Sequence, residues 1–215
     1  MRGLYAIIDI DTLTRRGVPP VPFAERVLAA RPAALQLRDK RGGARATLEL
    51  LRAIAPLAAA AGVPFFANDR PDLALLAGCD GVHVGQDDLP VALIRSAFPG
   101  LRVGLSTHDA AQVEQAAGEA PDYLAVGPIF ATASKENPSP VVGVAALRAL
   151  VARCREARPG LPIVAIGGIT LETAGEIGSI VDAVAAIGAL LPEAGLPAVE
   201  ESARALHATI LGERR

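Results

Sequence analysis

The sequence has few of the residues from which a disulfide framework or a zinc site is built. Cys79 and Cys154 are the only cysteines among 215 residues; they stand far apart and form no CxxC pair. Small disulfide-stapled domains and zinc ribbons need more cysteines at closer spacing. The composition therefore predicts two reduced thiols, as is usual in a cytoplasmic protein.

The sequence also lacks an excess of charge of one sign and a long apolar run. Lys+Arg 21 against Asp+Glu 23 gives a net charge of −2, so no basic surface for nucleic acid is expected. No stretch reaches the ~18 uncharged apolar residues of a membrane span, and the apolar run at 4–8 is too short for a secretory signal. We expect a cytoplasmic protein without nucleic-acid or membrane partners, whose oligomeric state, a homo-oligomer included, stays open.

Short apolar runs separated by segments of helical spacing fill the chain. Runs bounded by Gly, Pro or charged residues are typical of strands buried on both faces, and segments such as 46–54 and 109–120 have helical patterns. This alternation predicts an α/β protein, a single (β/α)₈ barrel domain over residues 1–215. A doubly wound open sheet is the competing fold, although no GxGxxG follows the first strand. The eight expected strands are 4–9, 34–38, 64–68, 81–85, 102–107, 123–128, 162–168 and 182–188.

Polar residues gather after the expected strands, where a barrel places its active site. Packing alone does not require polar clusters at one end of six strands. We therefore predict an enzyme whose site lies at this end of the barrel. The polar residues and glycines are Gln36, Arg38 and Lys40; Asn68 and Asp69; Gln86, Asp87 and Asp88; Ser106, Thr107 and His108; Thr132, Ser134 and Lys135; and Gly167 and Gly168.

The segment LQLRDK (35–40) has the pattern of a diphosphate site. Alternate side chains of a strand share a face, so Gln36 and Arg38 point into the barrel, with Lys40 at its mouth. Two cations and an amide suit a pyrophosphate group. The alternative is a strand-end Arg–Asp pair beside a solvated Lys.

Carboxylates end two neighbouring strands. Mg²⁺ takes oxygen ligands and keeps waters and substrate phosphate oxygens, so Asp69 and Asp88 suffice as protein ligands. The alternatives are a salt bridge from Asp69 to Arg70, and a helix cap formed by Asp87 or Asp88.

Three further features bear on chemistry. The loop GPIFATASKENP (127–138) offers hydroxyls and a cation that suit either a lid over an anion or an ordinary surface loop. Glycines after the seventh and eighth strands place backbone N–H groups where such barrels bind phosphate. His83 and His108 are each either a proton carrier or a structural histidine. The clusters predict transfer of a group from a diphosphate to a second, phosphorylated substrate.

The motifs LQLRDK, ANDRPDLAL, DGVHVGQDDLP, GLSTH, DYLAVGPIFATASK, AIGGIT and AVAAIGAL occur in order over residues 4 to about 190. This ordered set resembles the thiamine phosphate synthase family. The resemblance implies a (β/α)₈ barrel that joins hydroxymethyl-aminopyrimidine diphosphate to a thiazole phosphate and releases pyrophosphate.

The resemblance also implies roles for single residues. Arg38, Lys40 and Lys135 would be catalytic, and Asp69 and Asp88 would bind Mg²⁺. The residues implied for the pyrimidine diphosphate are Gln36, Leu37, Arg38, Asp39, Lys40, Asn68, Ser106 and Lys135, and those for the thiazole phosphate are Thr132, Ala133, Ser134, Gly168, Ile187 and Gly188.

The sequence departs from the family pattern in three places. Ile187-Gly188 stands where Ile-Ser is usual, 132–135 reads TASK rather than TxTK, and the first strand ends in IIDID rather than ITD. None of these changes removes a charged group. The alternatives are a thiazole tautomerase of the same superfamily, which would use His108, and a non-catalytic barrel that binds phosphorylated ligands.

Overall fold

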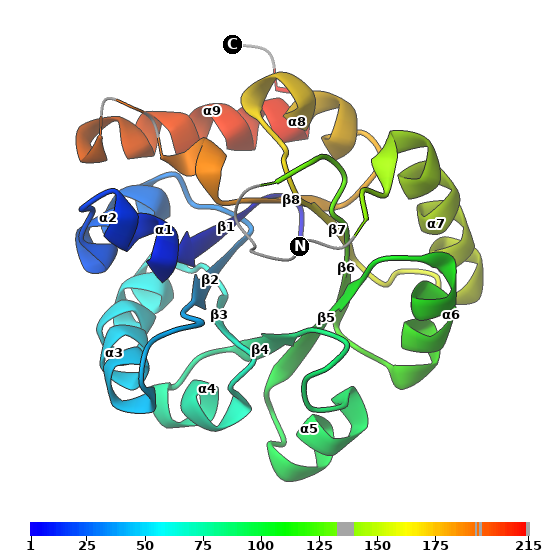
Figure 1. Ribbon diagram of the computed structural model, residues 1–215, viewed down its shortest axis with the longest axis horizontal. Helices are drawn as coiled ribbons and strands as arrows, with labels where there is room; N and C mark the ends of the chain where they lie inside the picture. The colour runs from blue at the N-terminus through cyan, green and yellow to red at the C-terminus, as the bar shows by residue number, and fades with distance from the viewer. Residues whose placement is uncertain (133–139, 192, 194, 214–215) are drawn as a thin grey trace.

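The computed structural model describes residues 1–132, 140–191, 193 and 195–213. Within them, parallel strands close into a barrel in the order β1-β2-β3-β4-β5-β6-β7-β8, and Figure 1 shows the helices as a ring outside it. The strands are β1 (Gly3–Asp9), β2 (Ala34–Arg38), β3 (Phe65–Asn68), β4 (Gly81–Val84), β5 (Arg102–Thr107), β6 (Tyr123–Val126), β7 (Ile163–Ile166) and β8 (Ala183–Ala186). The helices are α1 (Ile10–Arg15), α2 (Pro20–Ala29), α3 (Ala44–Ala61), α4 (Pro71–Ala77), α5 (Val91–Ala97), α6 (Ala110–Glu119), α7 (Gly143–Ala157), α8 (Leu171–Gly178) and α9 (Val199–Leu211), with 3₁₀ turns η1 (Gly188–Leu190) and η2 (Leu196–Ala198).

Pairing between the first and last strands closes the sheet. Gly3 of β1 lies opposite Ala183 of β8 in a parallel register. An open, doubly wound sheet would leave these two strands as edges, so that alternative is wrong and the predicted (β/α)₈ fold is confirmed. No helix in the described part of the chain is long and apolar enough to cross a membrane.

Each strand sends alternate side chains to two separate apolar layers. Leu35 and Leu37 of β2 belong to the large layer between the strands and the helices. The smaller layer, inside the barrel, includes Tyr5, Phe66 and Tyr123. Gly104 makes room for Tyr123, because a Cβ at Gly104 would lie 2.0 Å from Tyr123 Cζ. The large aromatic rings therefore fill the lower barrel and leave its upper part open.

Two helices begin at residues that commonly serve as caps. Asp109 caps α6, accepting from Gln112 N at 2.9 Å, and Thr170 is the N-cap residue of α8. The expectation that Asp87 or Asp88 caps the next helix is wrong, because α5 starts after Pro90 and has no side-chain cap. Asp88 Oδ2 instead accepts from Gly85 N at 2.8 Å, which leaves Asp88 at the barrel mouth.

Candidate active site

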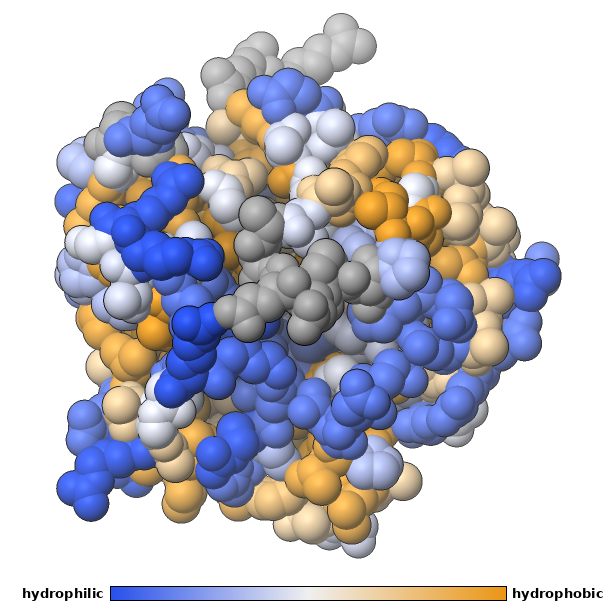
Figure 2. Space-filling view, in the orientation of Figure 1, coloured by the Kyte–Doolittle hydropathy of each residue, from blue (hydrophilic) through white to orange (hydrophobic). Residues whose placement is uncertain are grey.

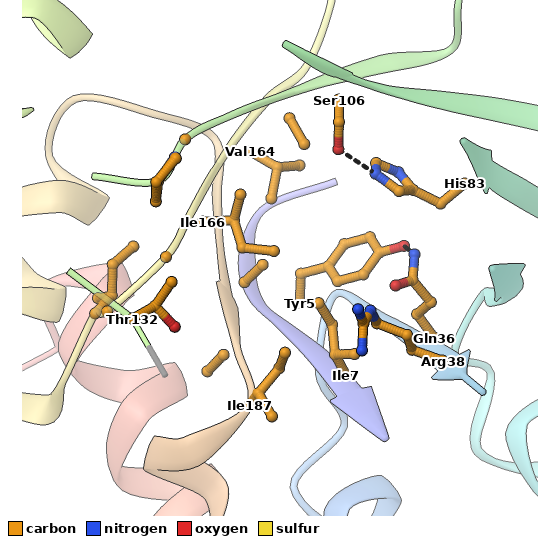
Figure 3. A pocket seen from close by; sticks show the side chains of 18 of the residues that line it. Tyr5, Ile7, Gln36, Arg38, His83, Ser106, Thr132, Val164, Ile166 and Ile187 are labelled. Carbon is orange, nitrogen blue, oxygen red and sulfur yellow. Dashed lines mark hydrogen bonds between the residues drawn. The ribbon is translucent and has the colours of Figure 1, made fainter. Parts of the chain in front are cut away.

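A cavity of about 640 Å³ opens above the interior aromatic layer, at the carboxyl ends of the strands. Hydrophilic residues surround the centre of this face over β2 to β5 (Figure 2). Within the cavity, Gln36, Arg38 and His83 lie on one side, and Val164, Ile166 and Ile187 form an apolar wall on the other (Figure 3). The cavity thus has a polar half from β2–β5 and an apolar half from β7 and β8.

A buried ion pair holds Arg38 in the polar half. Asp9 and Arg38 are register partners at the ends of β1 and β2, and Arg38 Nη1 donates to Asp9 Oδ2. Asp9 is 2% exposed, and its Oδ1 accepts from Thr12 N at 2.9 Å at the start of α1. Because Asp9 is fixed by both contacts, it orients the guanidinium at the cavity. The alternative prediction of a strand-end Arg–Asp pair is therefore met, but Arg38 of this pair also lines the cavity.

Lys40, Asp69 and Asp88 meet at the mouth. Lys40 Nζ pairs with Asp69, whereas Arg70 bonds Asp72, with Arg70 Nε 2.8 Å from Asp72 Oδ1. The alternative prediction, a salt bridge from Asp69 to Arg70, is therefore wrong. Burial raises the pKa of the Asp69 carboxyl, Lys40 lowers it, and the neighbouring Asp88 raises it again. Two adjacent carboxylates favour binding of a cation.

Asn68 presents an unsatisfied donor. Its Nδ2 is buried and has no hydrogen-bond partner among the described residues, and its side chain lines the cavity. A buried donor without a partner costs about 1–3 kcal/mol. Such an atom at a cavity indicates an acceptor supplied by a ligand.

A chain of hydrogen bonds crosses the barrel beneath the cavity. Gln36 Nε2 donates to Tyr5 Oη at 3.1 Å, and Tyr5 Oη lies 2.7 Å from Tyr123 Oη. His83 Nδ1 is 2.9 Å from Tyr123 Oη, and His83 Nε2 is 2.8 Å from Ser106 Oγ. Both ring nitrogens of His83 are bonded. His108 also lines the cavity, where its Nδ1 contacts the Gly127 carbonyl oxygen.

Backbone turns of β7 and β8 shape the apolar half. Gly168 has a φ of +64°, and a Cβ there would lie 2.3 Å from the Ala131 carbonyl oxygen. Glycine is thus required at this close approach. Gly188 begins η1, and a Cβ added to it would meet nothing within 4 Å.

Most residues predicted for the site come together in the structure. Leu37 does not, because its side chain packs toward the helices. Asp39 does not line the cavity either; it accepts from Gly42 N at 2.7 Å and from Thr47 Oγ1 at 2.8 Å. Ala133, Ser134 and Lys135 lie outside the described residues. The predicted residues that line the cavity are Gln36, Arg38, Lys40, Asn68, Asp69, Asp88, Ser106, Thr132, Gly168, Ile187 and Gly188.

Sequence reasoning missed Tyr5, Tyr123 and Asp9 as parts of the site. A usable pattern existed for Asp9, an acid that ends the strand before Arg38. Tyr5 and Tyr123 stand in apolar runs and look like ordinary core residues. Only their facing positions inside the barrel reveal the shared hydrogen bond.

A closed (β/α)₈ barrel with cations, carboxylates and an unsatisfied amide at its carboxyl-end mouth defines a barrel enzyme whose cavity suits an anionic ligand. A comparison with protein families specifies it further. The family described as thiamine monophosphate synthase matches residues 4–190, and the chain belongs to this family.

Individual relatives agree with this assignment. A protein of Koribacter versatilis named thiamine-phosphate synthase is 44% identical over 199 residues, covering 87% of this chain and 88% of the relative. A thiamine-phosphate synthase of Methanoculleus marisnigri is 39% identical and covers 99% of this chain and 98% of its own length. The solved thiamine phosphate pyrophosphorylase from Pyrococcus furiosus superposes with a TM-score of 0.82 at 29% identity, covering 99% of this chain and 97% of that one.

Proposed function

We propose that the protein is a thiamine-phosphate synthase. It transfers the pyrimidinylmethyl group of hydroxymethyl-aminopyrimidine diphosphate to the ring nitrogen of hydroxyethyl-thiazole phosphate. The bond between the methylene carbon and the diphosphate oxygen breaks, its electron pair leaves with pyrophosphate, and a carbon–nitrogen bond forms. The observation that supports this most is the meeting of Arg38, Lys40 and Asn68 Nδ2 at one cavity, in a chain whose relatives are named for this activity.

The polar half of the cavity suits the pyrimidine diphosphate. Arg38 and Lys40 offer charge-assisted donors to phosphate oxygens. Asn68 Nδ2 lacks a partner in the described chain, and a phosphate oxygen would satisfy it. Gln36 and Ser106 stand deeper, where they would contact the pyrimidine and its methylene oxygen. Lys135 completes the set of cations in our proposal.

Mg²⁺ fits the donor set at the mouth. The carboxylates of Asp69 and Asp88 are neighbours, and burial together with the hydrogen bond and charge of Asp88 raises the pKa of Asp69. The described residues include no group of three or more His, Cys, Asp or Glu side chains that could hold a metal. An ion held by two carboxylates would therefore need its other ligands from water and phosphate. Asp69 and Asp88 would hold the ion, which when bound would neutralise charge on the pyrophosphate.

Asp69→Asn or Asp88→Asn is expected to raise the Mg²⁺ concentration for half-maximal turnover about tenfold or more, because carboxylate number sets divalent-cation affinity. The fold should survive, since Asn also adopts the positive φ of 61° found at Asp69. Asp72→Asn is the matched control, because Asp72 pairs with Arg70 outside the cavity. Titration of activity with Mg²⁺ measures the shift, and an unchanged titration in the double variant contradicts the metal site.

The apolar half suits the thiazole phosphate. Ile187 and Ile166 would contact the thiazole ring, and the backbone N–H groups at Gly168 and Gly188 would receive its phosphate. Thr132 lines the same part of the cavity, and Ala133 and Ser134 are proposed with it. The two halves would thus hold the two substrates face to face.

Gly188→Ser is expected to leave the KM for thiazole phosphate unchanged or to lower it several-fold, because an added hydroxyl is a further phosphate donor. The space is present, since a Cβ at Gly188 meets nothing within 4 Å. Gly168→Ser is the contrasting variant, because its Cβ would lie 2.3 Å from the Ala131 carbonyl oxygen. Steady-state kinetics with varied thiazole phosphate measures the KM of both variants, which should rise only in Gly168→Ser. If Gly188→Ser loses thiazole phosphate binding, the phosphate binds elsewhere.

The tautomerase alternative and the non-catalytic alternative explain less of the site. A tautomerase needs a proton carrier such as His108 but has no diphosphate to bind. A simple binding protein needs neither the carboxylate pair nor the cations. Arg38, Lys40, Asp69 and Asp88 all line the cavity, which favours the synthase. We further propose that it acts in the cytoplasm on small molecules alone.

The proposed function is tested by mixing the purified protein with both substrates and Mg²⁺. Thiamine phosphate and pyrophosphate should appear in equal amounts, and neither should form when one substrate is left out. Hydrolysis of the diphosphate without coupling, or no reaction at all, overturns the proposal.

A further inference from the structure

The only two tyrosines in the chain, Tyr5 and Tyr123, are bonded to each other inside the barrel. Each is 2% exposed, and burial raises the pKa of both phenols well above 10. Both therefore keep their single proton at neutral pH. Each hydroxyl can donate one hydrogen bond only, so the chain from Gln36 to Ser106 has a direction.

The direction is set at the Gln36 end. Its amide Nε2 donates to Tyr5 Oη at 3.1 Å. The Tyr5 proton then has Tyr123 Oη, 2.7 Å away, as its acceptor. Reversing the Tyr5–Tyr123 bond would leave the Tyr5 proton without an acceptor among the described residues of the barrel interior, which is costly.

The remaining links follow from this order. Tyr123 donates to His83 Nδ1 at 2.9 Å, so the neutral imidazole carries its proton on Nε2. His83 Nε2 donates to Ser106 Oγ at 2.8 Å. Figure 3 shows Gln36 turned toward Tyr5, and Ser106 bonded to His83 of the neighbouring strand. The Ser106 proton is thereby left to point at a ligand.

If the Gln36 amide turned over, every link would reverse. Oε1 would accept from Tyr5, His83 would carry its proton on Nδ1, and Ser106 would donate to His83 and offer only lone pairs to the ligand. The orientation of one amide is thus coupled to the polarity of a hydroxyl on another strand.

We propose that Tyr5, Tyr123 and His83 are positioning residues that lock the Gln36 amide and the Ser106 hydroxyl to each other, in this structure with Oε1 toward the cavity and Ser106 as a donor. This inference rests on the proposed function and deepens it. An aminopyrimidine edge presents an amine donor beside a ring-nitrogen acceptor, which matches Oε1 and the second hydrogen of Nε2. An oxopyrimidine presents the reverse pattern, which only the turned amide would match. In the direction that the chain has here the site matches the amino form, and an oxopyrimidine would require every link to reverse.

The test compares the Kd of the aminopyrimidine diphosphate with that of the corresponding oxopyrimidine diphosphate, by calorimetry without thiazole phosphate. Binding is measured because the oxo group also alters the chemical step. The wild type should prefer the amino form. Tyr5→Phe keeps the ring but frees the amide, so the preference should fall about tenfold or more.

The double variant Tyr5→Phe/Tyr123→Phe tests whether the two tyrosines act through one connected hydrogen-bond chain or independently. Once Tyr5→Phe has opened the chain, adding Tyr123→Phe should cost little further preference, whereas independent defects would add. Thr47→Val is the matched control: it removes another buried hydroxyl, that of Thr47 on α3, which donates to Asp39 Oδ2 at 2.8 Å outside the cavity. Its preference for the amino form should equal that of the wild type.

A measurement on the wild type stands even if the variants fold poorly. Nitrogen-15 NMR of His83 should show the proton on Nε2 and none on Nδ1. The opposite tautomer, or an unchanged preference in folded Tyr5→Phe, overturns the lock. Such a result with a wild type that still makes thiamine phosphate removes the lock alone, whereas a wild type without synthase activity removes both proposals.

Discussion

Arg38→Met is expected to lower kcat/KM for the pyrimidine diphosphate about a thousandfold, because it removes a charged donor that we propose binds the phosphates. Truncating one partner of a buried, hydrogen-bonded charge pair costs about 2–5 kcal/mol, and 1.4 kcal/mol is a tenfold change. The Arg38 side chain is only 12% exposed, so solvent screens it weakly. The measurement is steady-state kinetics at saturating thiazole phosphate.

The same variant should also destabilise the fold, and a second variant separates the two effects. Asp9, which is 2% exposed, would lose its partner, and breaking a buried pair costs about 3–5 kcal/mol. The double variant Asp9→Asn/Arg38→Met removes the negative charge that Arg38→Met alone leaves unpaired at Asp9. The amide oxygen of Asn still accepts the hydrogen bond from Thr12 N. Stability against urea should then largely recover, whereas activity should not. Recovery of activity together with stability contradicts a direct role for Arg38.

Arg102→Met is the control for the loss of an arginine. Arg102 begins β5 at the opposite end of the barrel and pairs with Asp80 at 3.2 Å, with both side chains more than 40% exposed. Exposed ion pairs contribute about 0–1 kcal/mol. Neither stability nor kcat/KM should change appreciably in Arg102→Met. A large effect of Arg38→Met is then due to the position of Arg38 at the cavity and not to the loss of an arginine in general.

A trifluoromethyl group on the pyrimidine is expected to slow the chemical step by several orders of magnitude. The described cavity offers cations and donors that would stabilise charge on a departing pyrophosphate. Ser106 Oγ lies 2.8 Å from His83 Nε2, but in the chain proposed above this nitrogen donates, so it does not act as a base for Ser106. Burial raises the pKa of the Cys79 thiol to about 12, which keeps it protonated. We therefore propose that pyrophosphate departs before the thiazole nitrogen adds. The methylene carbon then becomes cation-like, and an electron-withdrawing group opposes this.

Single-turnover kinetics measures this step without product release. The Kd of the substituted diphosphate should stay near that of the natural substrate, since the cavity of about 640 Å³ leaves room for the added atoms. A rate equal to that of the natural pyrimidine would require a displacement driven by the attacking nitrogen instead.

The sequence by itself determined the barrel and most of the list of site residues. Eight apolar runs with helices between them admit few folds, and the strand ends at Arg38, Asn68 and Ser106 must meet at one end of a parallel barrel. The alternation of Leu35, Gln36 and Leu37 also indicated which side chains face inward. Local pattern is sufficient for these features because strand period and chain direction are local properties.

Only the tertiary structure decided which side chains bond one another. The Arg38–Asp9 pair depends on the register of β1 against β2. Tyr5 and Tyr123 are 118 positions apart in sequence, yet their hydroxyls lie 2.7 Å from each other. The chain of hydrogen bonds from Gln36 to Ser106 arises in the same way, as does the burial of Asn68 Nδ2 without a partner among the described residues. Contacts of this kind depend on closure of the barrel, which brings distant strands to a common interior, and no local pattern encodes that geometry.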